Sequence, residues 1–149
     1  MDAPQPPAAA ARPLLYFVHW QRAGADERAA RLASWGYDVR YDFSYDKDEL
    51  DRTTQRVLAL RPDAIVMSLD EFPGYTRSFA QVLKARSGLH KVPRLVVGGE
   101  TDQVALTQQR VPEATYTTWE SLPEALTATL GQEPPAANVP PIAEARAFL

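Results

Sequence analysis

Cysteine is absent from this 149-residue chain, and histidine occurs only twice. Without a thiol the chain can form no disulfide bond, thiolate metal site, iron–sulfur cluster or cysteine nucleophile, and two histidines give little basis for a transition-metal site. Positive charge is also scarce. Sixteen Lys and Arg against 19 Asp and Glu leave a net charge of −3, which does not favour binding to nucleic acid.

Long hydrophobic runs are missing as well. No apolar run reaches the roughly 20 residues that a membrane span requires, and residues 1–13 lack the basic start and apolar stretch of a signal peptide. We therefore expect a soluble, cytoplasmic protein that needs no cofactor and binds no membrane. The chain is 45% hydrophobic, which is enough apolar material for the core of one domain.

Proline is concentrated at the two ends of the chain and marks two tails. Residues 1–12, rich in alanine and proline, are predicted to be a disordered tail because they have almost nothing to bury. Residues 13–131 form the predicted domain. Residues 132–149 are predicted to be a Pro-rich linker followed by a short amphipathic helix over 142–149, which is too short to be stable unless it docks.

Segments of strand length alternate with segments of helical period between these tails. The strand candidates are residues 14–19, 37–43, 64–68, 94–98 and 114–119. The helix candidates are residues 26–35, 46–60, 76–87, 101–110 and 121–130. Gly36, Gly88 and Gly131 are predicted to end three helices, and Ser121 with Glu124 has the spacing of a capping box.

This fivefold alternation predicts a parallel sheet covered by helices on both faces. The first, third and fourth strand candidates are continuously apolar, as buried central strands are, whereas the second alternates and the fifth interleaves threonines. Strands two and five are therefore the predicted edges. The result is an α/β, flavodoxin-like (βα)5 three-layer sandwich with the order 2-1-3-4-5, whose crevice lies at the carboxyl ends of the central strands.

Short motifs stand at fixed places along this pattern. Gly36-Tyr-Asp-Val39 opens the second strand, Arg61-Pro-Asp63 leads into the third, Pro93 opens the fourth and Tyr116 lies in the fifth. Their order and spacing resemble those of the receiver domain of response regulators, over residues 13–131. The resemblance implies a CheY-like fold and a place in signal transduction.

The resemblance also implies chemistry that this chain lacks. Receivers use an acidic pair that holds Mg²⁺, an aspartate that takes the phosphoryl group, and a hydroxyl and a lysine that sense it. Here the matching positions, together with that of the switch aromatic, form a degenerate site. A histidine imidazole and a tryptophan indole cannot replace the two carboxylates that bind Mg²⁺. They are His19 and Trp20 for the acidic pair, Ser68 for the acceptor, Gly98 for the hydroxyl, Tyr116 for the aromatic and Trp119 for the lysine.

Three alternatives at these positions remain open. Asp70, two residues after Ser68, becomes the acceptor if the loop is aligned differently. His19, Ser68 and Asp70 together invite a hydrolase interpretation, although Ser68 lacks the glycines of a nucleophile elbow. The turn Gly98-Gly99-Glu100-Thr101 offers backbone N–H groups to a phosphate, although Glu100 repels an anion; otherwise it is a tight turn with Thr101 as the helix N-cap.

We interpret the chain as a pseudo-receiver that binds a protein partner without phosphorylation and without a metal. Trp20 and Trp119 are expected to fill the space around the degenerate site. The alternative is a small-ligand-binding protein or enzyme that uses the strand-end crevice. Acidic residues cluster over 38–51 and basic residues over 77–94. These clusters either orient a partner of complementary charge or are two ordinary solvent-exposed faces.

The partner surface is predicted from the receiver resemblance and from the tail. Receivers commonly use the fourth helix, the fifth strand and the fifth helix to bind partners, which the edge position of the fifth strand leaves accessible here. The segment 142–149 is predicted to dock on an apolar groove of its own domain or of a second chain. The predicted contact residues are Val104, Tyr116, Trp119, Phe148 and Leu149.

Overall fold

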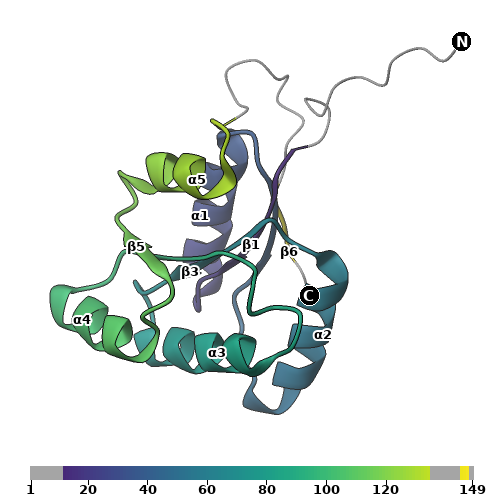
Figure 1. Ribbon diagram of the computed structural model, residues 1–149, viewed down its shortest axis with the longest axis vertical. Coiled ribbons are helices and arrows are strands. Elements are labelled where there is room, and N and C mark those ends of the chain that lie inside the picture. Colours follow the sequence, from purple (N-terminus) through teal and green to yellow (C-terminus); the bar gives the residue numbers. More distant parts are fainter. Residues whose placement is uncertain (1–11, 135–144, 148–149) are drawn as a thin grey trace, which may run out of the picture.

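The computed structural model describes residues 12–134 and 145–147 (Figure 1). Among these residues no helix is both long and apolar enough to cross a bilayer. The elements in chain order are β1 (Leu14–Val18), α1 (Arg22–Ser34), β2 (Asp38–Asp42), the 3₁₀ turn η2 (Lys47–Glu49), α2 (Leu50–Leu60), β3 (Ala64–Ser68), α3 (Pro73–Ala85), β4 (Arg94–Val97), α4 (Thr101–Arg110), β5 (Thr115–Thr117), α5 (Leu122–Leu130) and β6 (Ala145–Ala147).

The strands form one parallel sheet in the order β5-β4-β3-β1-β2-β6. The order of the first five strands confirms the predicted flavodoxin-like topology. The buried side chains of β1 and β3 explain their central places, because a strand covered on both faces must be apolar throughout.

The sixth strand corrects two predictions. Residues 145–147 pair in parallel with β2, in the register Val39 with Ala145 and Tyr41 with Ala147, so they are not part of the predicted helix, and β2 is not an edge. Residues 145–147 do dock on their own domain, through backbone pairing at a sheet edge. Unpaired N–H and C=O groups along the outer edge of β2 favour this outcome, since they form a template for pairing with another strand. Phe148, Leu149 and the tail over 1–11 lie outside the described residues.

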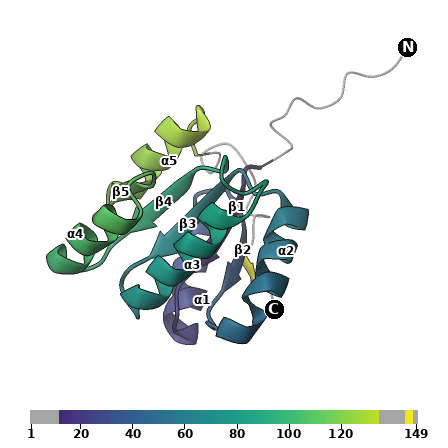
Figure 2. The ribbon, with the colours of Figure 1, turned by 60° about the horizontal axis from the view of Figure 1, so that its bottom comes forward.

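Helices cover both faces of the sheet (Figures 1 and 2). On one face α1 and α5 pack on alternate strand residues such as Leu15 and Phe17 through a core that includes Leu32 and Leu126. On the other face α2 and α3 pack on Tyr16 and Val18, with Phe79 and Leu83 of α3 in the core. The alternation of β1 side chains between two apolar layers produces the predicted three-layer sandwich.

Two helices begin earlier than predicted, one because of a side-chain cap and the other because of a proline. The Gln21 side chain accepts a hydrogen bond from the Gly24 N–H at 2.7 Å, and α1 therefore starts at Arg22 rather than residue 26. Helix α3 starts at Pro73, a residue suited to the first helical turn, and ends at Ala85, before Gly88.

Three other helix starts differ in detail. The segment predicted as one helix over 46–60 divides into η2 and α2, since the Asp46 side chain caps the 3₁₀ turn by accepting from the Asp48 N–H. The N-cap of α4 is Glu100, and Thr101 is the first helical residue. Ser121 makes no side-chain cap at α5, so the predicted capping box does not form.

Candidate functional site

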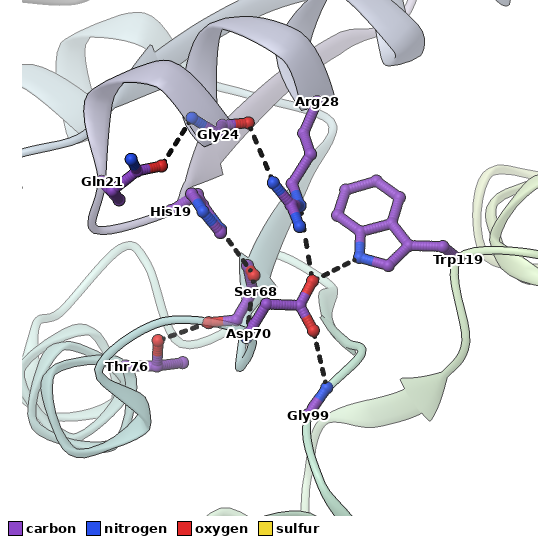
Figure 3. Close-up of polar contacts among 9 residues, drawn as sticks. All are labelled: His19, Gln21, Gly24, Arg28, Ser68, Asp70, Thr76, Gly99 and Trp119. Atoms are coloured by element: carbon purple, nitrogen blue, oxygen red, sulfur yellow. Dashed lines mark hydrogen bonds and ion pairs between the residues drawn. The ribbon is translucent and has the colours of Figure 1, made fainter.

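The candidate site is the strand-end crevice, formed by the segments that follow β1, β3, β4 and β5 (Figure 3). Parallel strands end at the same edge of a sheet, so segments distant in sequence meet there. Four of the predicted site residues come together through side-chain contacts, and Gly98 lies against one of them. The four are His19, Ser68, Asp70 and Trp119.

His19 and Ser68 form a buried pair beneath the crevice. The His19 Nδ1 and the Ser68 Oγ are 2.9 Å apart, and the same Oγ accepts the Asp70 backbone N–H at 3.1 Å. His19 is 1% exposed and Ser68 is 0% exposed. A serine hydroxyl that no substrate can reach does not support the hydrolase interpretation, because a nucleophile must be accessible.

The environment of His19 keeps its ring neutral. The pKa of His19 is lowered to about 4, chiefly by burial and also by the positive charge of Arg28, while the negative charge of Asp70 opposes both. The second ring nitrogen, Nε2, is buried and has no hydrogen-bond partner among the described residues. A Cβ on Gly24 would lie 2.5 Å from this nitrogen, so the absence of a side chain at Gly24 allows α1 to cross closely above the ring.

Asp70 connects three separate segments through its carboxylate (Figure 3). Its Oδ1 accepts the Gly99 backbone N–H at 3.0 Å, and its Oδ2 accepts the Trp119 indole N–H at 2.8 Å. The same Oδ2 lies 3.4 Å from Nε of Arg28, with the two side chains 25% and 29% exposed. Both oxygens of this carboxylate are therefore occupied by groups of the chain itself.

Trp119 closes one side of the crevice. Its ring meets Phe17 edge-on at 5.9 Å, and the guanidinium groups of Arg28 and Arg31 lie over it at 5.8 and 5.6 Å. An indole face attracts cations, so the two arginines and the N–H bond to Asp70 hold the ring from several directions.

Glycine is required at the turn after β4. Gly98 and Gly99 have φ angles of 77° and 89°, a region that residues with a side chain rarely adopt. A Cβ on Gly98 would also meet the Asp70 carboxylate at 2.4 Å. The backbone N–H of Gly99, which the sequence offers as a phosphate donor, is already bonded to Asp70.

Two predicted site residues lie away from this cluster. Trp20, 6% exposed, packs against Tyr45 and Phe79 on the α2–α3 face, and its indole N–H donates to Thr76 at 2.8 Å. Tyr116 donates its hydroxyl proton to the Val111 carbonyl at 2.7 Å. With Val104 it lines a groove of about 480 Å³ between α4 and β5.

Comparison with known proteins identifies the architecture. No protein-family model and no curated protein matches the sequence. Among solved structures, a putative response regulator from Chloroflexus aurantiacus J-10-fl matches with a TM-score of 0.62 at 16% identity, covering 81% of this chain and 99% of that one. The signal receiver domain of a modulated diguanylate cyclase from Desulfovibrio desulfuricans G20 matches with a TM-score of 0.58 at 19% identity, covering 80% and 94%. The chain has the receiver fold.

A third solved structure agrees with this assignment. The N-terminal domain of a response regulator receiver protein from Methanoculleus marisnigri JR1 matches with a TM-score of 0.53 at 17% identity, covering 80% of this chain and 98% of that one. The receiver fold thus accounts for most of the described chain, and β6 is an addition to the five strands that the sequence predicted.

The residues of the crevice do not fit the Mg²⁺ ion that receivers use. Mg²⁺ requires hard oxygen ligands in octahedral geometry. His19 and Trp20, the residues predicted at the positions of the acidic pair, carry rings without an oxygen atom, and these rings contact Ser68 and Thr76. No cluster of three or more His, Cys, Asp or Glu suited to a metal occurs in residues 12–134 and 145–147.

The sequence missed Arg28 and Gly24, which complete this receiver-fold crevice. Arg28 pairs with Asp70, and its Nη1 also donates to the Gly24 carbonyl at 3.3 Å. A glycine inside a helix is a signal of close approach, but the predicted helix over 26–35 leaves Gly24 outside it. For Arg28 the sequence alone holds no signal, since one arginine on a helix resembles any other.

Proposed function

We propose that the chain is a pseudo-receiver, a protein-interaction module that acts in signalling or regulation without being phosphorylated. The bonding of Asp70 carries this proposal. Its carboxylate already supplies the negative charge at the strand ends, and three donors from α1, the turn after β4 and the segment after β5 surround it. A site that holds its own anion is fixed in one state rather than switched by an added phosphoryl group.

The acceptor position supports the same conclusion. Ser68 is fully buried, and its hydroxyl oxygen contacts both His19 and the Asp70 N–H. A hydroxyl also forms no acyl phosphate. Asp70, the alternative acceptor, has both oxygens engaged, so attack on a phosphoryl donor requires it to leave Gly99 and Trp119 first.

Treatment with acetyl phosphate and Mg²⁺ tests the proposal. We expect no covalent adduct by intact mass and no change in affinity capture of protein partners between treated and untreated samples. The Asp70→Asn variant is the matched control, because it keeps the size of the side chain and removes its charge. A stoichiometric, base-labile adduct on Asp70 that is missing from Asp70→Asn would overturn phosphorylation independence.

The partner surface we propose is the α4–β5–α5 face of a cytoplasmic module. Val104 and Tyr116 line its groove with partly buried side chains, which a partner's apolar groups can cover. Trp119 contributes from the crevice side, where Asp70 holds its ring. β6 lies at the opposite edge of the sheet, away from this face.

A small-ligand protein is the second candidate, favoured by a hollow of about 470 Å³ at the strand ends. Its lining includes Asp70 and Glu100, and two carboxylates repel phosphorylated ligands. We therefore expect nucleotides, flavin and phosphorylated metabolites to leave the melting temperature unchanged. A stabilisation that saturates with one of them, as binding to the native state requires, would favour this second function.

A further inference from the structure

A second hollow lies on the α2–α3 side of the fold, apart from the strand-end crevice. It encloses about 170 Å³. A cavity of about 150 Å³ accommodates benzene, so the space suits a small organic group. The lining combines aromatic rings with carboxylates and includes Tyr16, Trp20, Asp42, Tyr45, Asp46 and Glu49.

Aromatic rings form the walls of this pocket. Trp20 meets Tyr45 at 5.5 Å with the ring planes at 86°, and meets Phe79 at 5.8 Å and 76°. The bond from the Trp20 indole to Thr76 fixes the ring, and Tyr45 stacks on Tyr75 at 4.5 Å. The walls are therefore held in place before any ligand arrives, which lowers the entropic cost of binding.

A buried carboxylate lines the same pocket. Asp42 is 2% exposed; its Oδ2 accepts the Tyr16 hydroxyl, while its Oδ1 is buried with no hydrogen-bond partner among the described residues. Burial raises the pKa of Asp42, although the Tyr16 bond and the positive charge of Arg56 both lower it. A buried carboxylate oxygen without a donor is costly, and a nearby positive charge relieves that cost.

Further negative charge surrounds the entrance. Asp46 and Glu49 line the pocket and are exposed, and Asp48 and Asp51 follow in the same acidic segment. Asp46 is engaged with the Asp48 N–H, and Glu49 lies 3.6 Å from Arg52. An anion is disfavoured here, and a neutral apolar group would leave the Asp42 carboxylate without a counter-charge.

We propose that this pocket binds an organic ammonium ion, namely the amino or N-methylated amino end of a short alkyl chain. The aromatic faces attract the cation and its alkyl groups, while Asp42 supplies the counter-charge. A hydrated Mg²⁺ fits less well, because it keeps its waters and gains nothing from apolar walls. The inference concerns a site separate from the crevice and does not depend on the proposed function.

The test uses choline and its uncharged isostere, 3,3-dimethylbutan-1-ol, with the full chain. The Trp20 indole N–H, followed by NMR, is expected to shift with choline and not with the alcohol. A peptide with one trimethyllysine provides the second arm, because the ammonium group reaches the pocket either as a free amine or as a side chain of a partner. Tighter binding of the peptide identifies a protein source, and tighter binding of choline a free amine.

Variants locate the binding within the pocket. Tyr45→Leu is expected to weaken binding about three-fold, as the loss of one partly exposed cation–π contact implies. Asp42→Asn is expected to weaken it at least about ten-fold, and Glu49→Gln reports on charge if Asp42→Asn does not fold. Asp102→Asn, an exposed acid on α4, is the control and should bind normally. Equal shifts by choline and the alcohol, or no shift by either cation, would overturn the proposal.

Discussion

Lowering the pH from 7 to 5 is expected to reduce the free energy of unfolding by about 2 kcal/mol through His19 alone. The pKa of His19 is about 4 in the folded chain and about 6.5 in an unfolded one. The unfolded state therefore binds the proton first. Stability falls as the pH drops below about 6.5, and the loss is complete below about 4, where both states are protonated.

Denaturant unfolding across this pH range checks the effect. The His19→Gln variant removes the titration and is expected to lose the part of the pH slope that His19 causes. His90, the other histidine, is exposed, so His90→Gln serves as the control and should retain the wild-type slope. Asp42, whose pKa is raised, contributes with the opposite sign at lower pH, which is why the slope is compared between variants. Identical slopes in wild type and His19→Gln would show that this ring is not held neutral.

Replacing Trp20 with alanine is expected to cost about 3–5 kcal/mol of stability, the range for removing a large aromatic side chain from a core. The indole is 6% exposed and contacts Tyr45, Tyr75 and Phe79 edge-to-face. Thr76 keeps a partner without it, since its hydroxyl donates to the Ser68 carbonyl at 2.6 Å. The loss therefore comes from packing and from the cavity that remains.

Trp20→Phe keeps part of the packing. Phenylalanine retains the six-membered ring but loses the five-membered ring of the indole and its N–H bond to Thr76, so we expect a smaller cost of about 1–2 kcal/mol. Chemical denaturation measured by circular dichroism avoids dependence on tryptophan fluorescence. A Trp20→Ala protein as stable as Trp20→Phe would show that the aromatic cluster contributes little to the core.

The sequence predicted the sheet because its signals are local. Strand β3 is a run of apolar residues, and α4 has helical periodicity from Thr101 to Arg110; both occur within the predicted bounds. The order of the first five strands was predictable because strands that are apolar throughout lie at the centre of a parallel sheet. Helix starts were less predictable, because the Gln21 cap and the Asp46 cap depend on the conformation of the loop before the helix.

Residues 145–147 show where local pattern is insufficient. The sequence Ala-Arg-Ala has good helix propensity, yet it forms β6. Backbone pairing along β2 outweighs that propensity, and no local signal reveals that an edge elsewhere in the fold is open. The local amphipathic pattern of residues 142–149, considered alone, therefore predicts a helix.

The sequence predicts where the candidate site lies, but not which hydrogen bonds its residues form. The spacing placed His19, Ser68, Asp70 and Trp119 at the strand ends, where the structure has them. That Asp70 bonds Trp119 and Gly99 could not be predicted, since it depends on side-chain directions and on a turn with two positive φ angles. Trp20 and Trp119, expected to share one space, lie on opposite faces of the sheet.

The pairing of β6 with β2 has a consequence for how the chain is made. β2 is synthesised early and β6 late, and theirs is the most sequence-distant strand pair in the described sheet. Closing so long a loop is entropically costly and slow. The outer edge of β2 therefore stays open on the nascent chain while the other strands assemble. During that interval two chains on neighbouring ribosomes can pair with each other along this edge.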